Sequence, residues 1–67
     1  MAGKTFTIEE AEAVKQTPDA LLIHSDNLPE DLWFPRSQID DDSEVYELGH
    51  KGDLVVSEWI AIQKGLV

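Results

Sequence analysis

The apolar residues of this 67-residue chain lie in short blocks separated by turn residues, and this arrangement limits what it can fold into. A chain of this length buries only about 60% of the surface that its unfolded state exposes. It contains no cysteine, so neither a disulfide framework nor a cysteine zinc site can substitute for a large core. We therefore expect a single small domain over residues 1–67, held together by packing of the short blocks.

The first block predicts a short helix over residues 8–16. Thr7 and Glu10 have the spacing of a capping box, in which the two side chains satisfy free N–H groups at the start of a helix. Pro18 favours an end just before it, because the residue preceding a proline avoids the helical region. The apolar residues with helical spacing in this block are Ile8, Ala11 and Val14.

Four later blocks read as strands joined by turns. They are Ala20–His24, Leu32–Phe34, Glu44–Leu48 and Asp53–Val56. The first two are expected to pair as a hairpin, and Gly49 and Gly52 mark the turn between the last two. After these blocks, Ser57 and Gly65 have the chemistry of the two ends of a second helix.

The predicted order is therefore α-β-β-β-β-α, an α+β fold. It consists of a small antiparallel sheet of three to four strands with a helix at each end of the chain. Adjacent strand residues face opposite sides, so only one of Trp33 and Phe34 can point into the core from a strand. The expected core comprises Leu22, Trp33 or Phe34, Val45, Val55, Trp59, Ile62 and Leu66.

Negative charge is the most prominent feature of the composition. Fourteen acidic and five basic residues give a formal charge of −9, which repels free nucleic acid and anionic membranes. The densest acidic segment contains Asp40, Asp41, Asp42, Glu44 and Glu47, and a second group contains Glu9, Glu10 and Glu12. One interpretation is a solvated face that keeps a small protein in solution.

The other interpretation is a surface that imitates phosphates. Alternate residues on a strand lie about 6.6 Å apart, near the spacing that we expect for successive phosphates of a nucleic acid. Arginine side chains grip carboxylates in the two-pronged way in which they grip phosphates. The acidic residues between Asp40 and Glu47, with the second group, are on this interpretation the partner-binding residues, steered onto a basic groove.

Catalytic and metal-binding patterns are not found in the sequence. The serines lack a nucleophile-elbow context, and the glycines lie in turns rather than in a phosphate-binding loop. A calcium loop starting at Asp40 would need a glycine where Val45 stands and an acid where Lys51 stands. His24 and His50 are not at metal-ligand spacing on one element. We expect no enzymatic activity, no metal and no cofactor.

No apolar run reaches the roughly 18 residues of a membrane span, and Met1–Glu10 lacks the apolar stretch of a signal peptide. This favours a protein of the cytoplasm without a membrane partner. Trp33 and Arg36 form an alternative docking site, because an aromatic residue left outside the core beside an arginine makes a suitable contact anchor.

The segment Trp33-Phe34-Pro35-Arg36-Ser37-Gln38-Ile39 carries a resemblance. Together with the turn at 40–43, the run at 54–61 and the ending at 64–66, it resembles a group of short proteins of bacteriophages and integrated mobile elements. Their pattern is Trp-Ile-Pro-Lys-Ser-Gln-Ile followed by a terminal Glu-Trp-Leu-Ala helix. The resemblance covers residues 20–67, with Phe34 and Arg36 as conservative departures, and it implies a phage setting without supplying functional residues.

In size and charge the chain is also similar to anti-CRISPR proteins and other inhibitors that mimic DNA. The resulting prediction is a non-enzymatic phage inhibitor in the host cytoplasm. It would bind a basic nucleic-acid-binding surface of a host defence protein, such as a CRISPR effector complex, and block access of DNA. The alternative is a small adaptor that docks through the Trp33–Ile39 surface. Either protein is expected to be a monomer or a small homo-oligomer.

Overall fold

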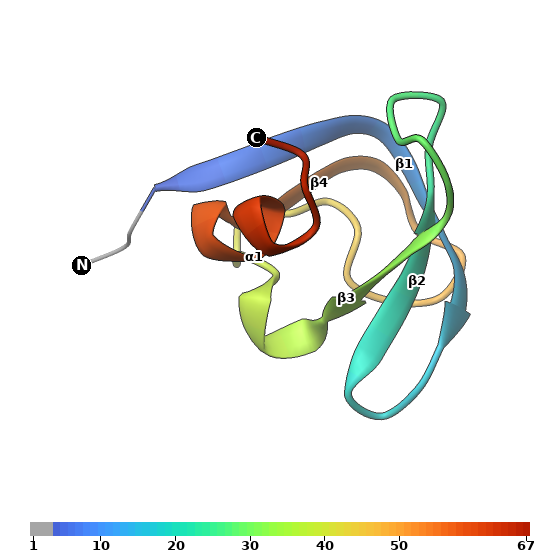
Figure 1. Cartoon of the computed structure of the whole chain (residues 1–67). Coiled ribbons are helices and arrows are strands. Elements are labelled where there is room, and N and C mark those ends of the chain that lie inside the picture. The colour runs from blue at the N-terminus through green and yellow to red at the C-terminus, as the bar shows by residue number, and fades with distance from the viewer. Residues whose placement is uncertain (1–3) are drawn as a thin grey trace.

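The structure is a computed structural model that describes residues 4–67. Its main feature is a curled antiparallel sheet (Figure 1). The strands are β1 (Thr5–Gln16), β2 (Ala20–His24), β3 (Leu32–Pro35) and β4 (Lys51–Ser57), in the spatial order β3-β2-β1-β4. A short 3-10 helix, η1 (Arg36–Gln38), follows β3, and the chain ends with helix α1 (Glu58–Gln63). The antiparallel sheet was expected, but the α-β-β-β-β-α order is wrong, because the first element is a strand.

A bulge in β1 explains why the helix predicted over residues 8–16 is wrong. Ile8 pairs with Leu54 of β4 and Ala11 pairs with Gly52, so two residues of β1 oppose one residue of β4. The extra residue turns Ile8 and Ala11 to the same side of the strand, and both are buried. An apolar spacing of three, which is typical of a helix, here results from an interrupted strand.

The conformation of β1 curls the whole sheet. Glu10, in the bulge, adopts a positive φ of 54°. A second irregularity, between Ala13 and Lys15, leaves Val14 without a partner on β2. The N-terminal part of β1 pairs with β4 and its C-terminal part with β2, so the two bulges bend the sheet between these neighbours (Figure 1).

The segment after η1 covers the outer edge of β4. Ile39 forms a bridge with Val56, and the Asp40 N–H donates to the Val55 carbonyl at 2.8 Å. Further along, the Glu44 N–H donates to the Asp53 carbonyl at 2.9 Å. The curl therefore brings the chain that leaves β3 against β4, at the opposite edge of the sheet.

The strand predicted over Glu44–Leu48 is wrong. The Ser43 hydroxyl, and not the backbone of a neighbouring strand, bonds the N–H and carbonyl groups of Val45. The buried Ser43 Oγ accepts from the N–H groups of Val45 and Val55, at 3.2 and 3.1 Å, and donates to the Val45 carbonyl at 2.8 Å. Val45 is buried as expected, but the chain continues through turns up to β4.

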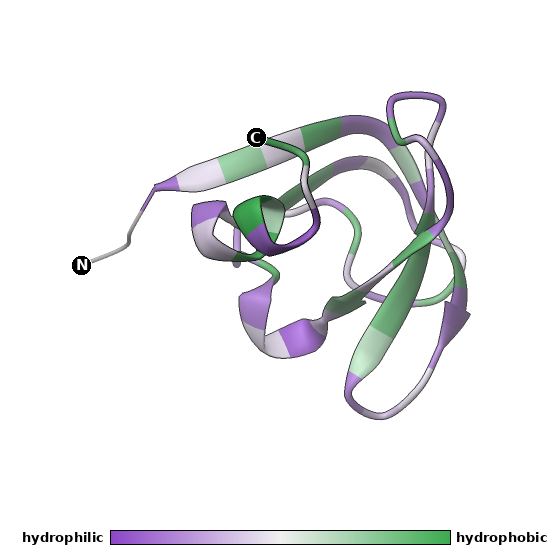
Figure 2. Ribbon diagram, in the orientation of Figure 1, coloured by the Kyte–Doolittle hydropathy of each residue, from purple (hydrophilic) through white to green (hydrophobic). Residues whose placement is uncertain are grey.

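Phe34, and not Trp33, belongs to the core. The β2–β3 hairpin, predicted correctly, pairs Leu21 with Phe34 and Leu22 with Trp33; the first pair is fully buried, whereas Trp33 is 40% exposed. The largest fully buried side chains are Phe34, Leu21, Ile23, Leu54, Val45 and Val56. Figure 2 shows hydrophobic stretches along the strands of the sheet and in α1. Leu22 and Val55, expected in the core, are half-buried because they alternate with the fully buried residues.

Helix α1 starts where the sequence predicts it. The Ser57 side chain accepts from the Ile60 N–H at 3.2 Å, and Gly65 has a φ of 75° just beyond the helix. Trp59 and Ile62, expected in the core, are exposed, because Ile60 and Ala61 are the buried residues of this helix. Leu66, also expected in the core, is half-buried and packs against it.

Candidate protein-binding surface

Two of the predicted partner-binding carboxylates hold the backbone of their own loop. The Asp40 carboxylate accepts from the Asp42 N–H at 3.0 Å and so closes a turn. The Glu44 carboxylate accepts from the Asp53 N–H at 2.9 Å. Gly52 makes room for it, since a Cβ at that position would lie 2.5 Å from Glu44 Oε1. Asp40 and Glu44 therefore contribute to structure.

The carboxylates of Asp41, Asp42 and Glu47 form what we call the acidic surface. All three residues are exposed, and the carboxylates of Asp41 and Asp42 accept no hydrogen bond from residues 4–67. Glu47 Oε2 lies 3.9 Å from His50 Nε2, which is a weak contact even when the imidazole is charged. These carboxylates are thus free to contact a partner.

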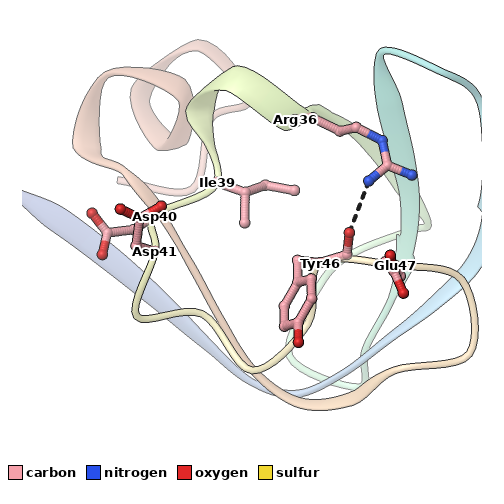
Figure 3. Close-up of a pocket in the computed structure, with 6 residues that line it drawn as sticks. All are labelled: Arg36, Ile39, Asp40, Asp41, Tyr46 and Glu47. Carbon is pink, nitrogen blue, oxygen red and sulfur yellow. Dashed lines mark hydrogen bonds between the residues drawn. The ribbon is translucent and has the colours of Figure 1, made fainter.

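An open groove of about 460 Å³ lies beside the acidic surface. It is lined by Arg36, Ile39, Asp40, Asp41, Tyr46 and Glu47. Figure 3 shows Asp40 and Asp41 on one side of Ile39, and Arg36, Tyr46 and Glu47 on the other. The groove therefore combines an apolar part with carboxylates at both ends.

Arg36 is a structural anchor. Its guanidinium donates to the Thr17 carbonyl at 3.3 Å and to Gln16 Oε1 at 2.9 Å. It also donates to the Tyr46 carbonyl at 2.9 Å (Figure 3). Gln16 Oε1 also accepts from the Leu48 N–H at 3.2 Å. Arg36 thus ties the loop around residue 46 to the end of β1, through three of the five N–H groups of its guanidinium.

Trp33, the other half of the predicted docking site, lies on the face of β3 opposite to Phe34. Its 40% exposure leaves part of the ring accessible. An aromatic residue is therefore accessible at this place, while the Arg36 guanidinium already makes three hydrogen bonds within the chain, and the docking site stays a prediction.

The second acidic group is not the helical patch that the sequence suggested. Glu9 and Glu10 are exposed in the bulge of β1, and Glu12 lies further along the strand, 3.9 Å from Lys51 Nζ. The backbone of Glu9 is fixed by the loop between β2 and β3. The Glu9 carbonyl accepts from Ser25 Oγ at 2.8 Å and from Asn27 Nδ2 at 2.9 Å.

Sequence reasoning missed Tyr46, which forms a wall of the groove and is 53% exposed. Its ring meets the His50 ring edge-on, with the centroids 4.4 Å apart and the planes at 79°. The Tyr46 N–H donates to His50 Nδ1 at 3.4 Å. The spacing of four between these residues is visible in the sequence, but only the turn at Gly49 brings them together.

Comparison with protein-family models, with curated proteins and with solved structures gives no match. The resemblance to phage proteins therefore stays a prediction. Within the part of the chain that the structure describes, no helix is long and apolar enough to cross a membrane. Among residues 4–67, no cluster of three or more histidine, aspartate or glutamate side chains is arranged to hold a metal ion.

Proposed function

We propose that this protein is a non-enzymatic inhibitor of phage type that binds a basic, nucleic-acid-binding surface of a host defence protein and excludes DNA from it. The observation that carries the proposal is the acidic surface, in which Asp41, Asp42 and Glu47 are exposed on a loop whose backbone is fixed by Asp40, Glu44 and Arg36. A loop whose backbone is already ordered loses little further backbone freedom when arginine or lysine side chains engage its carboxylates.

The proposal does not depend on evenly spaced carboxylates. Residues 44–48 are irregular and do not form a strand, so the phosphate-like repeat of about 6.6 Å expected for a strand does not apply to them. What supports competition with DNA is the formal charge of −9 on a body of 67 residues, because such a charge accelerates encounter with a basic groove.

The test uses a tagged protein, a nuclease-treated bacterial lysate, and salt at about 50 mM and about 200 mM. We expect a DNA-binding protein to be retained at the lower salt and released at the higher one. The affinity of that purified partner for DNA is then measured with and without this protein. The proposal requires that its addition weakens DNA binding.

Two variants of equal charge make the test specific. Asp41→Asn, Asp42→Asn and Glu47→Gln together remove the acidic surface, whereas Asp19→Asn, Asp26→Asn and Glu30→Gln remove the same charge from exposed turns elsewhere. The first triple variant should lose partner binding by at least about tenfold, and the second should keep most of it. Equal behaviour of the two variants would show that net charge, and not this surface, binds the partner.

The adaptor function is a second candidate because Trp33 is 40% exposed. Large aromatic side chains commonly anchor protein interfaces. In this case Trp33→Ala would abolish binding of the retained partner, while the first triple variant would bind normally at low salt.

A further inference from the structure

We infer that the groove beside the acidic surface seats an arginine side chain of the basic partner, with its guanidinium stacked on the Tyr46 ring. The inference rests on the proposed function and deepens it, since it names the side chain that the site recognises. A patch of carboxylates alone attracts any cation, whereas a groove with an aromatic wall can discriminate between cations.

The Tyr46 ring is exposed and yet held in place. Its carbonyl accepts from the Arg36 guanidinium at 2.9 Å, its N–H donates to His50 Nδ1 at 3.4 Å, and its ring packs edge-on against the imidazole of His50. More than half of the side chain, 53%, is nonetheless open to solvent. A ring that is already positioned costs little ordering free energy when a ligand stacks on it.

The charges that line the groove call for a cationic occupant. The groove is lined by three carboxylates, of Asp40, Asp41 and Glu47, and by one guanidinium, that of Arg36. Three N–H groups of this guanidinium donate to other residues of the chain. A second copy of this chain is a poor occupant, because each copy carries a formal charge of −9.

The apolar part of the groove suits the stem of a long basic side chain. Ile39 lies between the acidic pair Asp40 and Asp41 and the aromatic wall, as Figure 3 shows. The methylene groups of arginine or lysine pack on apolar surface while the charged head stays at its edge. Arginine fits better than lysine, since its planar head stacks on aromatic rings and pairs with a carboxylate through two hydrogen bonds.

The probes for the test are two amidated peptides, nona-arginine and nona-lysine, titrated into the 67-residue protein at about 50 mM salt by calorimetry. We expect the arginine peptide to bind about two- to fivefold more tightly than the lysine peptide. Tyr46→Leu should remove this preference, because leucine keeps the apolar wall but not the π face. Trp33→Leu, the matched change at an exposed aromatic of β3, should preserve it.

A measurement on the unaltered protein covers the case in which Tyr46→Leu fails to fold. The arginine peptide should shift the NMR signals of the Tyr46 ring and the Ile39 methyl groups more than the Trp33 ring signals.

Equal affinity for the two peptides, or a preference that survives Tyr46→Leu, would overturn the inference. The triple variant Asp41→Asn, Asp42→Asn and Glu47→Gln separates the two claims. If it binds both peptides as tightly as the unaltered protein does, the proposed function fails. If its affinity for both peptides falls and the unaltered protein shows no preference for arginine, only the arginine inference fails.

Discussion

At the scale of single residues, Gly52 shows how the absence of a side chain lets the Glu44 carboxylate reach the backbone of β4. Its φ of 140° is one that other residues rarely adopt, and Glu44 Oε1 occupies the space of a Cβ. We expect Gly52→Ala to lower the free energy of unfolding by about 1–3 kcal/mol, measured by urea denaturation. Gly49→Ala is the control, because Gly49 has a φ of 90° but nothing within 4 Å of its Cβ position. An equal loss in both variants would mean that backbone strain alone acts at Gly52.

His24 provides a residue-scale prediction about pH. Its Nδ1 lies 2.7 Å from Asp31 Oδ1, and this hydrogen bond, with the charge of Asp31, raises the pKa of His24 above its ordinary 6.5. A raised pKa means that the folded state binds the proton more tightly, so the stabilisation is complete below pH 6.5 and is lost as the pH rises through the folded pKa. Asp31→Asn should lower the pKa of His24 in an NMR titration and should reduce stability more at about pH 5.5 than at about pH 8.5. A larger loss at the higher pH would contradict this assignment.

At the scale of elements, the bulge of β1 depends on the loop between β2 and β3. Ser25, which is 4% exposed, and the exposed Asn27 both donate to the carbonyl of Glu9. We expect Ser25→Ala to cost about 1–2 kcal/mol of unfolding free energy, since it removes two part-buried hydrogen bonds, to the Glu9 carbonyl and from the Asn27 N–H. Asn27→Ala should cost less, because water can replace an exposed donor. The comparison is made by thermal and urea unfolding, and the reverse order would show that Asn27 is the main clamp.

At the scale of the whole molecule, the charge of −9 opposes compaction. Replacing Asp41 and Asp42 by Asn and Glu47 by Gln should leave the unfolding temperature unchanged or raise it. These carboxylates repel one another, and within residues 4–67 they accept no hydrogen bond that would be lost. The rise should shrink as salt is added, since ions screen repulsion between exposed charges. Calorimetry at several salt concentrations measures both effects. A lower unfolding temperature would show that the acidic surface contributes to the fold.

The sequence by itself determined the elements whose signals are local. The β2–β3 hairpin, strand β4 and helix α1 with its Ser57 cap follow from short apolar runs and from turn or cap residues beside them in the chain. The acidic residues of the acidic surface are likewise visible in the sequence, because the charge of a side chain can be read without knowledge of the fold.

Only the tertiary structure decided the rest, because it depends on partners distant in sequence. The apolar residues of segment 8–16 have helical spacing. Pairing with β4 and the hydrogen bond from the Ser25 hydroxyl to the Glu9 carbonyl nonetheless make it a bulged strand. The register of β3 on β2 places Phe34 inside and Trp33 outside, although either could have been buried. The structural role of Glu44, unlike that of Asp40, whose partner is the N–H group of Asp42 two residues away, was decided in the same way. A carboxylate braces the loop only where folding brings an N–H group within its reach, as Asp53 is brought to Glu44.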